Sequence, residues 1–205
     1  MIINDVNSLM RWQTAPEWDF EWDYSMGKLE EQTGWAIDTL GTTSSTLQSN
    51  GQKVTAAGTN SYYQIYPSRE GNLAWLRTMP NGIGVIECEV YIHLVNTNHQ
   101  NCRINIVESS SNRFCIYQAA GKWRKMDNNA MQSGTAIADF TNNTTTIVRL
   151  EMNGSSVNVY LNNSLAGTIS TSGTLYGSSN SIMPQNMGTG YIILKTFKLR
   201  VGRLV

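Results

Sequence analysis

The chain has 205 residues, of which 40% are hydrophobic and only 15% are charged. This length suits a single domain, and the hydrophobic fraction is sufficient for a sizeable core. Because 15 Lys and Arg residues balance 15 Asp and Glu residues, no net field attracts the chain to nucleic acid or to anionic lipid. The composition therefore argues against a nucleic-acid-binding function and against insertion into a membrane.

The N-terminus lacks the basic segment and apolar run of a secretory signal, and no apolar run is long enough to span a bilayer. The three cysteines, Cys88, Cys102 and Cys115, do not have the spacing of metal ligands and leave an odd thiol. We therefore expect them to be core thiols of a protein made in the cytoplasm, which could also be incorporated into a virion.

Residues 1–17 are predicted to form an N-terminal arm, and residues 18–205 a single folded domain. Leu9, Met10 and Trp12 are apolar without a helical or strand period, and Pro16 ends any short helix. Such an arm can pack on its own domain or on a neighbouring molecule. The three apolar residues of the arm are therefore candidates for assembly contacts.

Alternation of apolar and polar residues predicts short strands from residue 18 onward. The first, 18–24, carries four aromatic rings on one face, which we expect to cover the core or an oligomer contact. These rings belong to Trp18, Phe20, Trp22 and Tyr24. Further strands are predicted at 34–37, 53–56, 61–66 and 73–77, with a Ser/Thr/Gly-rich loop over 42–51.

Residues 83–95 form the longest predicted strand. Its alternation directs one set of side chains inward, namely Cys88, Val90, Ile92 and Leu94, and another outward, namely Glu87, Glu89, Tyr91 and His93. We expect 103–108 to pair with this strand, 113–118 to return beside it, and a brief strand to follow at 122–126.

Residues 146–171 predict an antiparallel meander of three strands. Asn153-Gly154 is a strong hairpin signal because both residues tolerate positive φ, and Asn162-Asn163 is a second turn candidate. A long polar loop is predicted over 172–190, and a last strand over 191–201. No stretch has a sustained helical period, so we predict an all-β fold, a two-sheet antiparallel β-sandwich.

The order of these features resembles the concanavalin A-like lectin/glucanase superfamily, in particular laminin-G-like jelly-roll domains. The similarity lies in an aromatic strand at 20–24, Gly34-Trp35, a strand at 50–55, the meander run at 146–168 and a last strand at 193–201. One departure is Asn163, where the family usually has glycine, but asparagine also tolerates the turn. The resemblance implies a jelly roll covering residues 18–205.

Some members of this superfamily hydrolyse glycosides with two carboxyl groups roughly 5 Å apart. Glu87 and Glu89 share one strand face, about 6 to 7 Å apart along the strand. The third carboxylate of the family's catalytic strand is missing, because Tyr91 and Ile92 occupy its two candidate positions. We therefore predict no catalytic residue, and a glycoside hydrolase is the weakest functional hypothesis.

Laminin-G-like domains often carry Ca²⁺ at a loop rim, held by carboxylates and carbonyl oxygens. Here Asp38, Asp127 and Asp139 are ligand candidates only individually, since acidic residues are scarce in the late loops and no D-x-D-x-D cluster exists. We expect no metal and no cofactor, and a structural Ca²⁺ lacks support.

Aromatic rings beside polar side chains suggest recognition of sugars, because a sugar ring stacks its C–H face on an aromatic ring while amides and guanidinium groups bind its hydroxyls. The alternative is that the rings fill the core. The candidate glycan-binding residues are Tyr62, Gln64, Tyr66, Trp75, Arg77 and Trp123.

Two main functional hypotheses follow. The first is a non-catalytic binding or adhesion module that recognises a glycan or cell-surface polysaccharide. The second is a structural phage virion protein, such as a tail, fibre or capsid-decoration component, that assembles with virion proteins or as a homo-oligomer through the arm.

Overall fold

The computed structural model describes residues 18–68, 83–95, 102–107, 113–126, 135–154, 156–170, 181–184, 187 and 190–202. The predicted arm at 1–17, with Leu9, Met10 and Trp12, lies outside these ranges, as does the predicted strand at 73–77. Within the described ranges no helix is long and apolar enough to cross a membrane.

Thirteen antiparallel strands and two short 3-10 helices make up the described chain. The helices are η2 (Tyr24–Met26) and η3 (Leu29–Glu31). The strands are β1 (Phe20–Asp23), β2 (Trp35–Gln48), β3 (Gly51–Pro67), β4 (Ile83–His93), β5 (Cys102–Val107), β6 (Arg113–Ala119), β7 (Lys122–Met126), β8 (Thr135–Asp139), β9 (Thr144–Asn153), β10 (Ser156–Leu161), β11 (Ser164–Ser170), β12 (Ser181–Pro184) and β13 (Tyr191–Val201).

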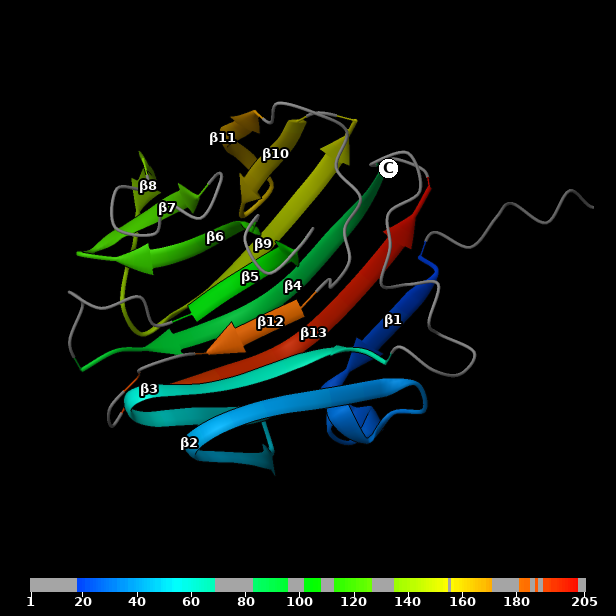
Figure 1. The fold of residues 1–205 in the computed structure, drawn as a ribbon, viewed down its shortest axis with the longest axis vertical. Helices are drawn as coiled ribbons and strands as arrows, with labels where there is room; N and C mark the ends of the chain where they lie inside the picture. The colour runs from blue at the N-terminus through cyan, green and yellow to red at the C-terminus, as the bar shows by residue number, and fades with distance from the viewer. Residues whose placement is uncertain are drawn as a thin grey trace, which may run out of the picture.

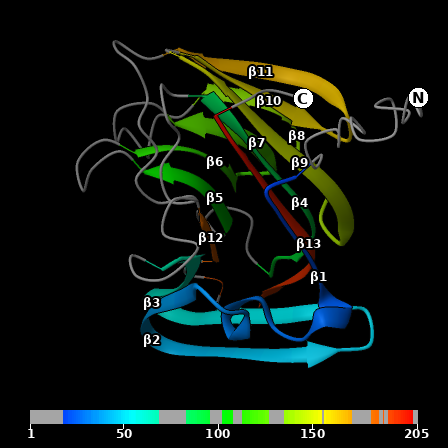
Figure 2. The same cartoon turned by 90° about the vertical axis from the view of Figure 1, so that its right-hand side faces the viewer.

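The strands form two packed layers, so the chain is an all-β antiparallel sandwich (Figure 1). One layer has the order β11-β10-β9-β4-β13-β3, with β1 also paired to β13; it is called the back layer. The other continues from β3 through β12-β5-β6-β7-β8 and is called the front layer. In Figure 2 the β2–β3 hairpin runs across the base, beneath both layers.

Strand β3 belongs to both layers. Its residues Gln52, Lys53 and Val54 pair with β13 in the back layer, whereas Ile65 pairs with Ile182 of β12 in the front layer. From the sequence, strands were predicted at 34–37, 53–56 and 61–66, with a loop over 42–51. The structure instead has one long hairpin of β2 and β3 across this region. The loop prediction was wrong because Ser and Thr side chains suit a ladder at its exposed edge.

Glycines form the corner where this hairpin passes between the layers. Gly41 has φ +74 and lies at a register shift in β2, between Leu40 and Thr42; Gly58 has φ +91 in β3. A Cβ atom at position 41 would overlap the side chain of Ser61, which is 2% exposed. The corner therefore requires glycine for its positive φ and for the space it leaves.

The core lies between the layers and follows the predicted alternation. The meander was predicted correctly as β9, β10 and β11, and its inward residues are fully buried: Val148, Leu150, Met152, Val157 and Val159. The inward residues predicted for β4 are also buried: Cys88, Val90, Ile92 and Leu94. The turn residues Asn162 and Asn163 have φ +50 and +65, as the turn prediction requires.

The aromatic strand covers the core. This was one of the two predicted roles for its rings, the other being an oligomer contact. Trp22 is fully buried, and its indole N–H donates to the carbonyl oxygen of Gly27 at 3.1 Å. The rings of Phe20 and Trp35 lie 4.8 Å apart, and Trp35 meets Phe197 edge to face at 5.3 Å. These contacts attach β1 and the start of β2 to the final strand.

One prediction of strand pairing and one prediction of a loop were wrong. Strand β5 pairs with β6 and β12, not with β4, because the chain crosses from the back layer to the front layer between β4 and β5. Strand β12 lies within the predicted loop over 172–190. Its register depends on β3 and β5, two segments distant in sequence, so local alternation could not indicate it.

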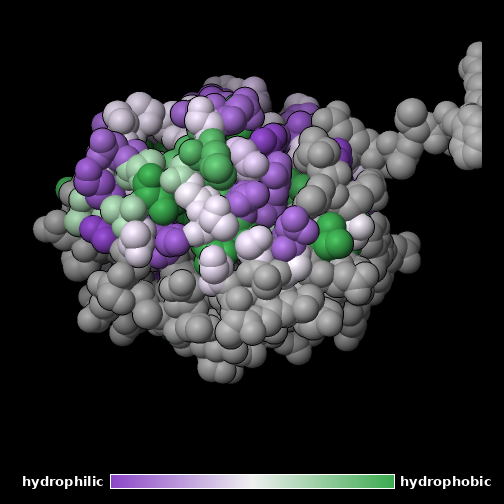
Figure 3. Space-filling model, turned by 90° about the horizontal axis from the view of Figure 1, so that it is seen from above, coloured by the Kyte–Doolittle hydropathy of each residue, from purple (hydrophilic) through white to green (hydrophobic). Residues whose placement is uncertain are grey.

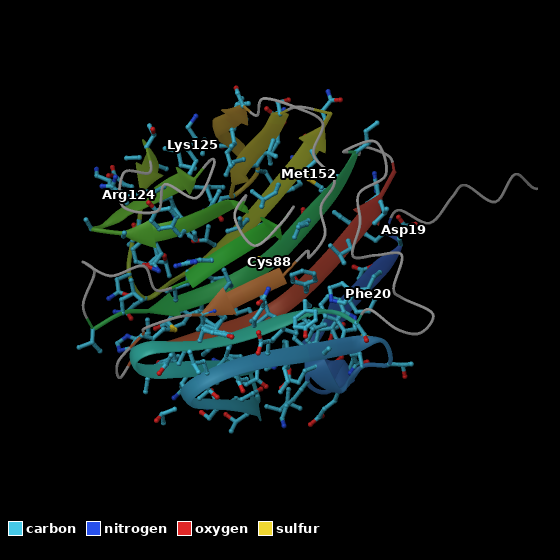
Figure 4. The ribbon with its side chains drawn as sticks, in the orientation of Figure 1. Asp19, Phe20, Cys88, Arg124, Lys125 and Met152 are labelled. Atoms are coloured by element: carbon cyan, nitrogen blue, oxygen red, sulfur yellow. The ribbon has the colours of Figure 1, made fainter. Side chains whose placement is uncertain are left out.

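The layers also meet at the edge opposite β3. The side chain of Ile137 in β8 occupies the space beside Gly167 in β11, where a Cβ atom would lie 2.9 Å from Ile137 Cγ2. Lys125 of β7 donates from Nζ to the carbonyl oxygen of Thr168 at 2.5 Å (Figure 4). An inward lysine of β7 thus joins the front layer to β11, the last strand of the back layer.

A buried polar cluster attaches η3 to the hairpin. The backbone N–H of Leu29 donates to Gln52 Oε1 at 2.8 Å, and Gln52 Nε2 donates to Ser45 Oγ at 2.9 Å. Glu30 accepts from Ser45 Oγ at 2.6 Å and from the Tyr63 hydroxyl at 3.0 Å. Burial, followed by the charge of Glu30, raises the pKa of Tyr63 to about 12.

Large exposed apolar side chains are scattered over the described surface, at Met26, Ile37, Leu40, Leu47, Val95 and Leu165. Seen from above, hydrophilic and hydrophobic residues alternate over the coloured part of Figure 3. Isolated apolar residues of this kind are normal on a protein surface, so they do not by themselves indicate a docking surface.

From the geometry of the corner we predict that Gly41→Ala strongly destabilises the folded protein. Both the positive φ and the overlap with Ser61 oppose a Cβ atom there, and we expect a loss of about 2 kcal/mol in the free energy of unfolding. Gly121→Ala is the matched control, since Gly121 has φ +69 with open space around it. Urea denaturation of both variants measures the difference, and equal losses would show that the overlap is relieved without cost.

Tyr63 predicts a loss of stability at high pH. Its folded pKa of about 12 exceeds the ordinary value of 10.0, so above pH 10 the unfolded chain releases this proton before the folded chain does. Stability therefore falls as pH rises through this interval, by up to about 3 kcal/mol for two pKa units. Urea denaturation from pH 9 to 12 should show a smaller fall in Tyr63→Phe than in the wild type; parallel curves would contradict the assignment.

Candidate functional site

The outer side of the front layer brings polar and aromatic residues into one row. Arg103 of β5 lies directly opposite Tyr117 of β6, and Tyr117 lies opposite Arg124 of β7. Residues directly opposite in an antiparallel pair share a face. Because Ile104 and Ile116 point into the core, the three row residues point away from it.

Strand β3 adds three predicted residues to the same side. Ile65 is in the core, so Gln64 and Tyr66 on either side of it point outward. Tyr62 is two positions before Gln64 and therefore lies on the same face. All three side chains are half-buried. We call the set Tyr62, Gln64, Tyr66, Arg103, Tyr117 and Arg124 the front face.

Burial differs along the front face. Arg103 and Tyr117 are each 1% exposed, although Tyr117 does not belong to the core cluster between the layers. Arg124 is half-buried at the far end of the row (Figure 4), and its Nε donates to the carbonyl oxygen of Ala119 at 3.3 Å. The face therefore has a buried middle between two more accessible ends.

A further contact fixes the β3 end. The hydroxyl of Tyr62 donates to Asp38 Oδ2 at 3.0 Å, and Asp38 lies opposite Gln64 in the β2–β3 ladder. This bond orients the Tyr62 ring along the edge of the front face. An aromatic ring held in this way presents carbon surface at a small entropic cost when a ligand binds.

The chemistry of the front face suits a neutral or acceptor-rich polar ligand. Guanidinium groups donate several hydrogen bonds in a fixed plane, an amide both donates and accepts, and tyrosine rings provide apolar contact. No nucleophile with an adjacent base occurs among these six side chains.

The other predicted glycan-binding residues have different positions. Trp123 faces the core: it is 2% exposed and its ring meets Phe140 edge to face at 5.7 Å. It lies opposite Gln118 in the ladder and so on the reverse side of β7 from Arg124. Trp75 and Arg77 lie outside the described residues.

Sequence reasoning missed Arg103, Tyr117 and Arg124. The flanking cations Lys122 and Arg124 made Trp123 look exposed, whereas strand alternation places Trp123 and its neighbours on opposite faces. The usable signal was Tyr117 directly after Ile116, since one of two consecutive strand residues must face outward. What could not be inferred was that β3 lies in the same layer as β5 to β7.

The carboxylates considered for hydrolysis lie elsewhere. Glu87 and Glu89 are on the outer side of the back layer, across the sandwich from the front face. Glu89 pairs with Lys195 at 3.2 Å, and Glu87 lies opposite Arg149 on one side and Lys198 on the other. Their cationic surroundings are those of a charged sheet surface.

Metal-ligand candidates do not converge in the described part of the chain. There, no group of three or more His, Cys, Asp or Glu side chains is placed to hold a metal ion. Asp38 accepts from Tyr62, and Asp139 pairs with Lys122. Asp127 lies outside the described residues.

Solved structures share this fold at low sequence identity. The carbohydrate-binding module CBM66 from Bacillus subtilis matches with a TM-score of 0.53 and 18% identity, over 83% of this chain and 97% of that one. A structure of botulinum neurotoxin type C, whose cell entry depends on interaction with two ganglioside molecules, matches with a TM-score of 0.55 and 13% identity. The match covers 83% of this chain and 44% of the neurotoxin chain.

A sialidase chain matches with a TM-score of 0.64 and 10% identity, over 89% of this chain. This chain spans only 18% of the length of that sialidase. At such identities the likeness establishes the fold alone. Neither a family model nor a curated protein matches the sequence.

The position of Trp123 predicts a structural role. Truncation in Trp123→Ala should lower the free energy of unfolding by roughly 3 to 5 kcal/mol, because it opens a cavity beside Phe140. Lys122→Ala, at the neighbouring exposed position, should change it by less than about 1 kcal/mol. Guanidinium denaturation measures both, and an unchanged midpoint in Trp123→Ala would show that the ring does not pack in the core.

Proposed function

We propose that the protein is a non-catalytic carbohydrate-binding module and that the glycan binds on the front face. The observation that carries the proposal is one row of side chains across the front layer, with Tyr62, Gln64 and Tyr66 at one accessible end and Arg124 at the other. Arg103 and Tyr117 form the buried middle that joins these ends. Aromatic rings next to planar hydrogen-bond donors are the groups that recognise a sugar's C–H face and its hydroxyls.

Two features support this proposal over an enzymatic function. The front face holds no pair of carboxylates, and Glu87 and Glu89 lie on the back layer. The structurally similar chains include a carbohydrate-binding module that this chain covers almost entirely. The assembly contacts expected of a virion component are in residues 1–17, which lie outside the described part of the chain.

The test is a glycan array followed by titration calorimetry with the best-bound glycan. Tyr66→Ala and Arg124→Ala change the two accessible ends of the front face and should each weaken binding about tenfold, equivalent to about 1.4 kcal/mol. Both side chains are half-buried, so we expect folding to survive, as checked by thermal melting.

The matched control is Tyr160→Ala. Tyr160 is a half-buried tyrosine on the outer side of the back layer, stacked under Arg149 at 4.5 Å. Binding should be unchanged in this variant and in the double variant Glu87→Gln, Glu89→Gln. Binding unaffected by both front-face variants would refute the site, and glycan cleavage lost in the Glu double variant would refute the non-catalytic assignment.

A further inference from the structure

A second cluster of aromatic and donor side chains lies on the outer side of the back layer. Tyr191, the first residue of β13, is directly opposite His93 at the end of β4, and Tyr91 is two positions before His93. The Tyr191 ring lies 4.9 Å from the His93 ring and 6.2 Å from the Tyr91 ring, centroid to centroid. Three half-buried rings therefore meet at one end of this layer.

A cation completes one side of the cluster. Lys53 of β3 places its Nζ 4.1 Å from the centroid of the Tyr191 ring. Lys53 forms no ion pair with a carboxylate in the described part of the chain. Glu89, two positions before Tyr91 on the same face, is already paired with Lys195 at 3.2 Å. Among the described residues, therefore, no acid neutralises the positive charge of the cluster.

An oriented amide completes the other side. Asn143 Oδ1 accepts a hydrogen bond from His93 Nδ1 at 2.6 Å and one from the Tyr91 hydroxyl at 3.3 Å. Burial and the neighbouring Tyr191 raise the pKa of Tyr91, which keeps its hydroxyl a donor. With both acceptor positions of the oxygen occupied, Asn143 Nδ2 retains its two N–H groups, which make no hydrogen bond to the described residues.

The turn that carries Asn143 is held rigidly. Asn142 Oδ1 accepts from the backbone N–H of Leu94 at 2.8 Å, and Asn142 Nδ2 donates to the Leu94 carbonyl at 2.8 Å. Asn143 itself has φ +61, a conformation that asparagine tolerates. The amide is therefore positioned beside the rings before any ligand arrives.

From this geometry we propose that Lys53, Tyr91, His93, Asn143 and Tyr191 form a second binding site, for a saccharide that carries a carboxylate. The Lys53 ammonium and the Asn143 amide offer donors to the carboxylate and hydroxyl oxygens, and the three rings offer carbon surface to the sugar ring. The site is separate from the front face and does not depend on the function proposed for it.

An acidic peptide is a poorer fit for this surface. Strands β4 and β13 are interior strands, paired on both sides, so no free backbone edge is present for an extended peptide to join. Recognition must come from side chains alone. The cluster spans only neighbouring positions on three strands and one turn, a size suited to a single sugar unit.

Methyl glucuronide and methyl glucoside are the probes, since they differ only in carboxylate against hydroxymethyl. Amide chemical shifts in ¹⁵N-labelled protein, followed at low ionic strength, report both affinity and location. We expect the glucuronide to bind at least tenfold more tightly than the glucoside and to shift the amides of Tyr91, Asn143 and Tyr191. Equal affinity for the two probes, or no binding of either, would overturn the proposal.

Two variants separate the site from general surface charge. Lys53→Gln should weaken glucuronide binding about tenfold, and Asn143→Asp should abolish it, because the carboxylate retains both accepted hydrogen bonds but repels the ligand's charge. Lys198→Gln, which removes a cation from the same face farther along β13, where its ion-pair partner is Glu21, should have little effect. An equal loss in Lys198→Gln would reduce the binding to non-specific attraction and refute the site.

A glutamate-rich peptide is the competing probe. If it shifted the same amides as tightly as the glucuronide, the assignment to a saccharide would be wrong. Thermal melting of each variant confirms folding before titration. Since Asn143 is exposed and Lys53 is half-buried and outside the core, both substitutions should leave the melting temperature within a few degrees of the wild type.

Discussion

The sandwich depends on β3 being hydrogen-bonded into both layers. Its first half pairs with β13 and its second half with β12, so one continuous backbone sets the relative position of the back and front layers. Backbone hydrogen bonds tolerate little displacement. Packing between two separate sheets would allow sliding, whereas a shared strand fixes their register as well as their distance.

This arrangement also determines where the side chains of β3 can act. Lys53 lies on the outer side of the back layer, and Gln64 lies on the outer side of the front layer. Between them the strand turns at Gly58, opposite the irregularity at Gly41. A single strand thus contributes to two polar surfaces on opposite sides of the molecule, and the corner controls the orientation of both.

Local pattern predicted the elements well where strands alternate and are joined by short turns. The inward faces of β4 and β9, and the Asn162-Asn163 turn, followed from alternation and from the conformational tolerance of asparagine. Pairing between distant segments was not predictable in this way. The partner of β5, the existence of β12 and the joining of two predicted strands into β3 all depend on contacts across the sandwich.

The same distinction applies to the candidate sites. Tyr62, Gln64 and Tyr66 were recognisable because they alternate along one strand, but Arg103 and Tyr117 join them only through the order of strands in the layer. Trp123 was a binding candidate because of its charged neighbours, with a core position as the alternative, and it lies in the core. The charge of neighbouring residues therefore indicates whether a strand residue is buried less reliably than the alternation of inward and outward positions along the strand.

The bulge at Gly41 lies on a strand edge that another molecule could approach. In the described chain β2 pairs with β3 alone, which leaves a 14-residue strand with one open edge. Open edges invite a strand from another copy and lead to aggregation. The register shift between Leu40 and Thr42 interrupts this edge. A bulge of this kind hinders pairing with a straight incoming strand, so the glycine that bends the hairpin also protects its edge.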